Sequence, residues 1–160
     1  MKFDHQPLLG PGKHYMSLNH LERLTTTFGD VSHRENLFAH LNELHSEIVS
    51  LGIRVDLWVD GSFVSEKAQP SDIDGVIAIH ADEFDACTTE VQDFLDGFND
   101  DAFSDPPILD FFTHIIYDSD DPRREIEESS WEWQWSKQHD EKHLKGFASI
   151  VVGGAKYEPF

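Results

Sequence analysis

Three aspartates in the middle of the chain have the residue type and spacing to bind a divalent metal ion. Asp72 and Asp74 are separated by one residue at the start of the segment DIDGVIAI. Alternate residues of a strand point to the same face, so the two carboxylates project together. Two unit charges ~4 Å apart repel by about 4 kcal/mol at an effective dielectric of about 20. The natural counterion is a hard, oxygen-seeking cation such as Mg²⁺ or Mn²⁺.

The third aspartate, Asp110, lies inside the otherwise apolar segment ILDFFTHII. Burying an unpaired carboxylate in such a strand is costly, so Asp110 needs a partner. We therefore expect its strand to neighbour that of Asp72 and Asp74. The three carboxylates would then lie within a few ångströms of one another at one end of a sheet and hold one or two metal ions. Taken singly, each aspartate also fits a solvated strand end or a salt-bridge partner.

Residues that could bind phosphate lie on either side of this set. Gly61 and Ser62 end the preceding strand. Glycine lets the backbone approach a phosphate closely, and the serine hydroxyl and N–H groups can donate to its oxygens. Lys67 and Lys145 are scarce cations in an acidic chain, and either could neutralise triphosphate charge. The alternatives are an ordinary turn for the Gly-Ser pair and solvated side chains for the lysines.

The hydrophobic pattern predicts an α/β (α+β) fold in which a mixed sheet is flanked by helices. Residues 1–16 contain two prolines and two glycines, which predicts an extended, irregular arm. A short helix is expected over residues 17–28. Ser32 and Glu35 read as a capping box that starts a second helix, and Gly52 ends it. A single helix is expected over residues 84–98, and Asp121-Pro122 is typical of the start of another.

Four segments have the composition of strands. Residues 53–59 alternate between apolar and polar, which predicts a strand with one face more buried than the other. Continuous apolar runs indicate buried strands at residues 72–79 and 108–116. Residues 147–152 form the last predicted strand. No repeat or long linker divides the sequence, so we expect one domain over residues 1–160.

The formal net charge of −19 limits the partners. Such a surface repels polyanions, so no extended contact with DNA or RNA is expected, whereas a nucleotide that carries its own metal remains compatible. The single cysteine, Cys87, suits a reducing compartment. No apolar run reaches the ~18 residues of a membrane span, and the N-terminus lacks the apolar stretch of a signal peptide. We expect a cytoplasmic protein without a membrane partner.

Other chemistry-bearing residues have simpler explanations. The ten histidines include no pair that combines with cysteines at zinc-ligand spacing, and His139 and His143 would share a face only within a helix. Cys87 has no identifiable histidine–carboxylate arrangement and is expected in a helix core. Trp131, Trp133 and Trp135 could stack on a nucleobase or bind a partner, but packing over the sheet explains them as well.

The order of these motifs resembles that of the polymerase-β-type nucleotidyltransferase superfamily. The shared pattern is Gly-Ser, then Asp-x-Asp, then a third acidic residue on a later strand. Further short stretches resemble a small prokaryotic and viral nucleotidyltransferase-like family, and they span nearly the whole chain: LLGPGKH at residues 8–14, WVDGSFV at 58–64, Lys67, PSDID at 70–74 and Lys145-Gly146. One departure is Gly75, which follows the aspartate pair where an apolar residue is usual and is expected to loosen the strand.

The resemblance implies the minimal nucleotidyltransferase fold and a role for each motif. Gly61 and Ser62 would touch the triphosphate, Asp72 and Asp74 would bind both metals, and Asp110 would bind the catalytic metal and help to activate an acceptor hydroxyl. The expected reaction moves a nucleoside monophosphate from a triphosphate, ATP above all, to that hydroxyl.

The acceptor would come from another molecule, because the small domain leaves little room for a separate acceptor domain. We expect a protein or tRNA in a toxin–antitoxin, AMPylation-type or defence setting, or a second subunit of the same chain. The alternatives are a non-catalytic nucleotide- or partner-binding module of the same fold and a metal-dependent phosphohydrolase.

Overall fold

The computed structural model describes residues 6–98, 108–117 and 146–153. Several predictions therefore lie outside the described residues: the helix expected from Asp121, the tryptophans at 131, 133 and 135, the histidines at 139 and 143, and Lys145. No helix in the described ranges combines the length and the apolar character needed to cross a membrane.

The described strands form one five-stranded mixed sheet in the order β1-β5-β2-β3-β4. Its strands are β1 (Gly12–Tyr15), β2 (Val55–Asp60), β3 (Ile73–His80), β4 (Leu109–Ile116) and β5 (Gly146–Val152). The β1–β5 and β3–β4 pairs are parallel, and β2 runs antiparallel to both β5 and β3. The predicted α+β class with a mixed sheet is thus confirmed. The four predicted strands correspond to β2, β3, β4 and β5, with bounds close to the predicted ranges.

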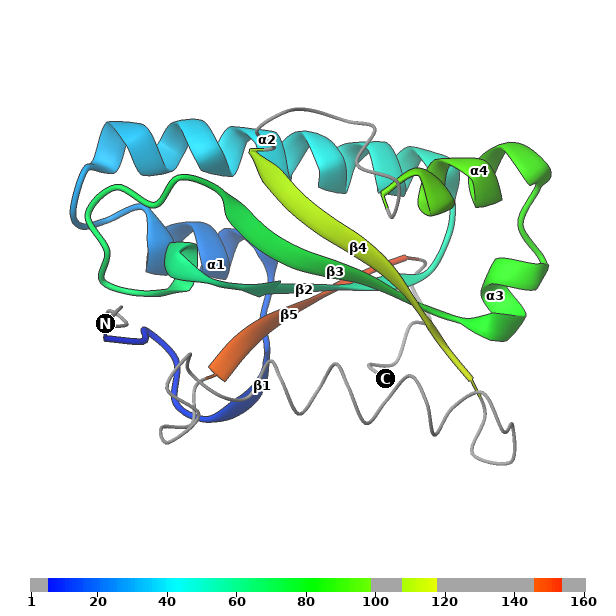
Figure 1. Ribbon diagram of the computed structural model, residues 1–160, viewed down its shortest axis with the longest axis horizontal. Helices are drawn as coiled ribbons and strands as arrows, with labels where there is room; N and C mark the ends of the chain where they lie inside the picture. Colours follow the sequence, from blue (N-terminus) through cyan, green and yellow to red (C-terminus); the bar gives the residue numbers. More distant parts are fainter. Residues whose placement is uncertain (1–5, 99–107, 118–145, 154–160) are drawn as a thin grey trace.

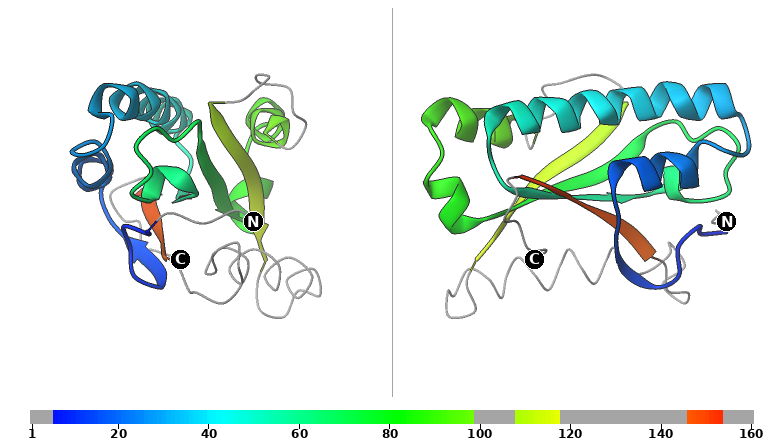
Figure 2. Two further views of the ribbon diagram at one scale, coloured as in Figure 1. Left: turned by 60° about the vertical axis from the view of Figure 1, so that its left-hand side comes forward. Right: turned by 180° about the vertical axis from the view of Figure 1, so that it is seen from behind.

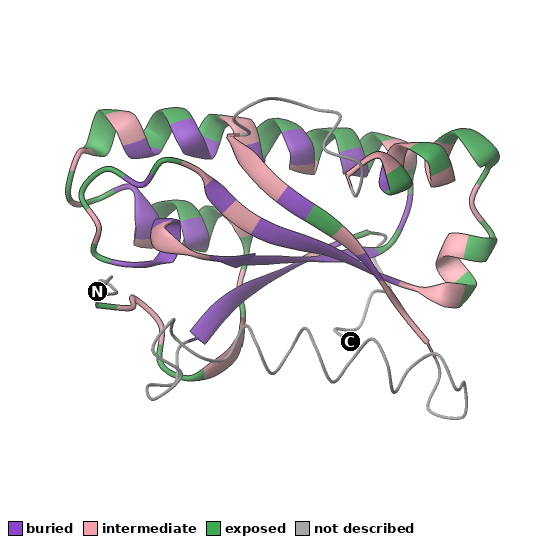
Figure 3. Cartoon of the chain, viewed as in Figure 1, coloured by how far each residue is buried: buried purple, intermediate pink, exposed green. Residues whose placement is uncertain are grey.

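The helices that contribute to the main core pack on one face of the sheet. They are α1 (Leu18–Thr25), α2 (Val31–Leu51) and α4 (Thr89–Gly97), with the short α3 (Ala81–Asp85) leading into α4. Figure 1 shows α2 running along the sheet, with α1 towards one of its ends and α4 towards the other, and Figure 2 gives the same arrangement from two further sides. The buried positions of α2 form a stripe (Figure 3) that includes Leu37, Leu41 and Ile48. This stripe covers odd-numbered residues of β2 and β3, such as Leu57 and Ile77.

The opposite face of the sheet carries a second, smaller cluster. Its buried members are Trp58, Val76, Ala78 and Phe147. They occupy even-numbered positions of β2 and β3, and odd-numbered positions of β5, and strand residues two apart share a face. The sequence places Asp60, Asp74 and Asp110 on this same face of their strands.

Two helix boundaries differ from the predictions because other residues form the caps. The cap of α2 is Asp30 rather than Ser32, since its carboxylate accepts a hydrogen bond from the backbone N–H of His33 at 3.1 Å. The helix therefore begins two residues earlier than expected, and it ends at Gly52 as predicted. The single helix expected over residues 84–98 is two helices, because Thr88 accepts a hydrogen bond from the N–H of Val91 and starts α4 anew.

The burial of β2 also corrects a prediction. All six of its residues are buried, so neither face is exposed. The polar Asp56 has no exposed surface because it pairs with Lys13 at 3.3 Å and accepts a hydrogen bond from the Ser149 hydroxyl. Lys13 belongs to β1, which replaces the irregular structure expected within residues 12–15. Alternating polarity misleads here because buried Asp56 has its partners on strands that are distant in the sequence.

Gly75 does not leave a gap in β3. It pairs across the strands with Phe111 of β4, and a Cβ at Gly75 would overlap the Phe111 ring. The ring therefore fills the space that a side chain at Gly75 would occupy, an arrangement in which an aromatic side chain covers a strand glycine. Both residues are buried on the helix-covered face. The expectation that Gly75 loosens the strand is thus not supported by the packing.

Candidate metal site

The strand register brings the three predicted aspartates together. Asp74 is the direct partner of Asp110 on the parallel neighbour β4. Asp72 lies just before β3, where the N–H of Ile73 donates to the carbonyl of Ile108 at 2.9 Å and continues the β3–β4 pairing. Asp74 is two residues after Asp72, so their side chains leave the backbone on the same side. The predicted neighbourhood of the two strands is confirmed.

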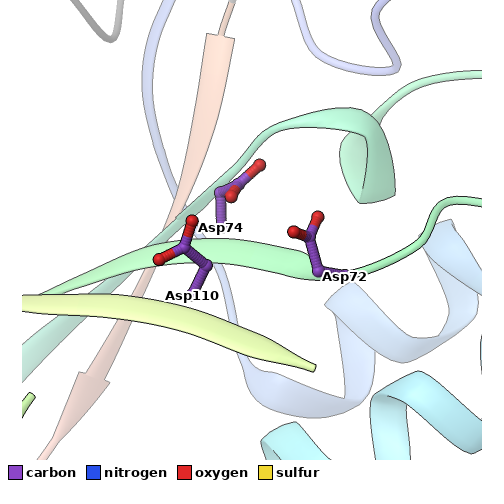
Figure 4. Close-up of side chains that lie close together, drawn as sticks. All are labelled: Asp72, Asp74 and Asp110. Atoms are coloured by element: carbon purple, nitrogen blue, oxygen red, sulfur yellow. The ribbon is translucent and has the colours of Figure 1, made fainter. Parts of the chain in front are cut away.

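One carboxylate oxygen from each of Asp72, Asp74 and Asp110 lies within 4.8 Å of the other two. Figure 4 shows the three carboxylates turned toward a common space, from the start of β3, from β3 itself and from β4. Oxygens on opposite sides of a bound Mg²⁺ are about 4.2 Å apart, given ligand distances of about 2.1 Å. The spacing and the oxygen-only donor set therefore fit a hard divalent cation after small side-chain rotations.

The electrostatics of the set favour a bound cation. The pKa of Asp74 is raised to about 7, first by burial and then by the charges of Asp72, Asp110 and Asp60. Burial, followed by the charge of Asp110, also raises the pKa of Asp72, while Lys67 acts in the opposite direction. The described groups that act on these two carboxylates are thus mainly acidic, with Lys67 as an opposing cation at Asp72. A divalent cation would remove this repulsion and hold them ionised.

Asp60 is a fourth acidic residue beside the site, and the sequence analysis did not single it out. It pairs with Asp74 across the antiparallel β2–β3 ladder and is 5% exposed. Asp60, Asp74 and Asp110 therefore stand side by side on three adjacent strands. The hairpin register is the missing signal, because Asp60 directly precedes Gly61 and reads from the sequence as part of a turn.

Gly61 lies against Asp74 at the end of β2. A Cβ at Gly61 would overlap Oδ2 of Asp74 and stand 2.9 Å from its Cγ. Its backbone has φ +80° and ψ −163°, a region essentially restricted to glycine. Both properties require glycine at this position. Ser62 follows at the start of a single 3₁₀ turn, η1 (Ser62–Val64), so the predicted Gly-Ser pair borders the carboxylates.

The two candidate lysines have different outcomes. Lys67 is half-buried in the loop between η1 and β3, and its charge lowers the pKa of Asp72. It is thus close enough to the carboxylates to act on them electrostatically. Lys145 lies outside the described residues, directly before β5. Its contact with a triphosphate stays a prediction.

The raised pKa of Asp74 predicts that the metal-free protein loses stability as the pH rises. The folded protein holds a proton on Asp74 up to a pKa of about 7, whereas the unfolded chain releases it near the ordinary value of 3.8. The free energy of unfolding should therefore fall between about pH 4 and about pH 7 by roughly 1–3 kcal/mol, after discounting for partial solvation. Urea unfolding across this range, with a chelator present, measures the effect.

Asp74→Asn provides the reference for this measurement, because it removes the titration but leaves the other carboxylates in place. The wild type minus variant difference in the free energy of unfolding should carry the predicted slope. With Mg²⁺ the slope should reverse, since only ionised carboxylates bind the metal. A difference that stays flat in chelator would contradict the proposed burial and charge repulsion at Asp74.

Comparison with known protein families assigns this chain to a family. The model of the family of unknown function DUF6932 matches residues 1–151, which is nearly the whole chain. No curated protein and no solved structure matches this chain.

Proposed function

Since the chain belongs to this family, DUF6932, we propose a function from its own site: a metal-dependent nucleotidyltransferase that moves a nucleoside monophosphate from a triphosphate to an acceptor hydroxyl. The observation that carries the proposal is the convergence of Asp72, Asp74 and Asp110 next to Gly61. The resemblance of the Gly-Ser and Asp-x-Asp motifs to the polymerase-β-type superfamily supports it.

The proposed reaction is an in-line displacement at the α-phosphorus. The acceptor oxygen forms a bond to this phosphorus, the bond between it and the α–β bridging oxygen breaks, and pyrophosphate leaves with the bonding electrons. Asp72 and Asp74 would together hold a pair of Mg²⁺ ions, and Asp110 would be a further ligand of the catalytic one. When bound, the metal would neutralise charge on the phosphate oxygens and lower the pKa of the acceptor hydroxyl.

The protein groups act mainly by positioning. Gly61 permits close approach of the backbone to the triphosphate, and the Ser62 hydroxyl would donate a hydrogen bond to a phosphate oxygen. Asp110, with its carboxylate directed toward the shared space, would accept the proton of the acceptor hydroxyl as the new bond forms. Lys67 would add positive charge at the side of Asp72. We propose ATP as the first triphosphate to test and a protein or tRNA hydroxyl as the acceptor.

Two other functions remain as outcomes of the test. A binding module of the same fold would take up nucleotide without turnover, although such a module has no chemical need for three converging carboxylates. A metal-dependent phosphohydrolase would use the same carboxylates with water as the acceptor. The released group separates it from a transferase, because nucleotidyl transfer yields pyrophosphate and labels the acceptor.

The test uses the full chain with Mg²⁺ and each of the four ribonucleoside triphosphates, labelled at the α-phosphorus. Reactions are run without lysate, with untreated cell lysate, and with lysate treated beforehand with protease or ribonuclease to remove one class of acceptor. Pyrophosphate release together with transfer of the α-label to a macromolecule supports the proposal. Release of inorganic phosphate alone, without label transfer, would identify a phosphohydrolase. Binding without any product in all mixtures would favour the non-catalytic module.

A further inference from the structure

Arg34 is a buried cation of α2 that hydrogen-bonds to the backbone of the loop after β2. It lies in the first turns of α2 and has no exposed surface. Its guanidinium donates four hydrogen bonds, all to backbone carbonyls. Nη1 donates to Thr25 at 2.9 Å and to Phe63 at 2.7 Å. Nη2 donates to Ser65 at 2.7 Å and to Lys67 at 2.6 Å.

Three of these acceptors belong to alternate residues of one loop. The carbonyls of residues 63, 65 and 67 all face the guanidinium, so this stretch of backbone wraps around it. The rings of Phe28 and Phe63 lie near the guanidinium, with centroids 4.3 and 5.5 Å from its Cζ. No carboxylate among the described residues forms an ion pair with Arg34. The guanidinium is therefore held through its two Nη atoms by backbone carbonyls and by aromatic faces, while its buried Nε has no hydrogen-bond partner among the described residues.

The start of α2 fixes the rest of the same loop. The N–H of Asp30 donates to the carbonyl of Ala68 at 3.1 Å, and the Asp30 carboxylate accepts from the side chain of Gln69 at 2.6 Å. The His33 ring contacts the carbonyl of Pro70 at 2.5 Å. The loop is thus tied to α2 at most positions between residues 63 and 70, with Arg34 at the centre.

This loop connects the two halves of the candidate site. It begins after Gly61 and Ser62 and ends at Asp72. Ser62 directly precedes the first carbonyl held by Arg34, and Lys67 contributes one of the others. If this position served only to fill the core, an apolar side chain would suit it better, because burying a cation carries a desolvation cost. Arginine offers something an apolar residue lacks, namely a rigid fork of donors for several carbonyls at once.

We propose that Arg34 is a positioning residue that sets the loop so that Ser62, Lys67 and Asp72 face one bound metal–triphosphate. The inference rests on the proposed function for the identity of the ligand, but the clamp on the loop can be tested without it. Arg34 touches no part of the ligand and acts only through the backbone carbonyls it holds.

The experiment compares Arg34→Met and Arg34→Lys with a matched control, Leu41→Ala. Leu41 lies on the same helix and is equally buried, but it belongs to the apolar stripe and its side chain has no donor for the loop carbonyls. All variants are studied below their melting transitions. One readout is amide hydrogen exchange of residues 62–71. The other is calorimetric binding of α,β-methylene-ATP with Mg²⁺, an analogue that nucleotidyl transfer cannot cleave.

Arg34→Met should speed exchange in the loop and weaken binding of the analogue by about tenfold or more, since small displacements of positioning groups have large effects. Arg34→Lys keeps the charge and can serve at most three of the four carbonyls, so its effects should be intermediate. It also carries the test if the methionine variant does not fold. Leu41→Ala should lower the melting temperature without changing loop exchange or binding by more than about twofold.

Two results would overturn the inference. In the first, the Arg34 variants show the same loop exchange and bind the analogue with the same affinity as the wild type. In the second, Leu41→Ala speeds loop exchange and weakens binding as much as the Arg34 variants do, which would mean that Arg34 contributes only to general stability. If the wild type itself does not bind the analogue, the proposed function fails, and loop exchange alone then decides whether Arg34 positions the loop.

Discussion

Asp74→Asn is expected to reduce nucleotidyl transfer by about a thousandfold or more, equivalent to about 4 kcal/mol of transition-state stabilisation. The amide keeps the size of the side chain but removes the charge of a proposed metal ligand. Without metal, the variant should be as stable as the wild type or more stable, because Asp74 is repelled by Asp72, Asp110 and Asp60. Transfer assays and melting curves in chelator measure the two effects.

Magnesium should stabilise the wild type more than the variant. A ligand at about one hundred times its Kd adds about 2.7 kcal/mol to a folded protein that binds it. For a chain of this size that is roughly 5–10 °C in Tm. Asp93→Asn is the matched control, because Asp93 is an exposed aspartate of α4 and its loss should change neither activity nor the magnesium response. If Asp74→Asn melts well below the wild type in chelator, Asp74 has a structural role and the metal site is wrong.

The sequence predicts the convergence of the three aspartates because its signals are local. Asp72 and Asp74 lie two residues apart, and the apolar neighbours of Asp110 identify its strand. The one additional assumption, that these strands are neighbours, follows from the cost of burying Asp110 alone. The register then places Asp74 directly beside Asp110.

The residues that the sequence does not reveal all act through distant partners. Arg34 resembles any polar residue of a helical first turn, but its acceptors are carbonyls from residues up to 33 positions away. Asp56 reads as the exposed side of an alternating strand, yet it is buried against Lys13 and Ser149. Asp60 joins the carboxylates only through the β2–β3 register. Contacts between side chains that are far apart in the sequence leave no periodic pattern in the sequence, unlike helices and strands.

Gly61→Ala is expected to lower activity by about a hundredfold, because it moves a metal ligand rather than removing one. The new Cβ would overlap Oδ2 of Asp74 in its present position, so the carboxylate must leave the position in which it lies beside Asp72 and Asp110. The positive φ of +80° adds backbone strain of about 1–3 kcal/mol. The variant should therefore melt lower in chelator and also gain less stability from Mg²⁺ than the wild type.

Gly52→Ala separates these two effects. Gly52 also has a positive φ, +71°, but a Cβ there meets no atom within 4 Å. It ends α2 away from the carboxylates, so its substitution adds backbone strain alone. We expect Gly52→Ala to melt lower while keeping the full magnesium-induced rise and full transfer activity. If Gly61→Ala behaves in the same way, Gly61 serves only the turn, and its contact with Asp74 has no part in metal binding or in chemistry.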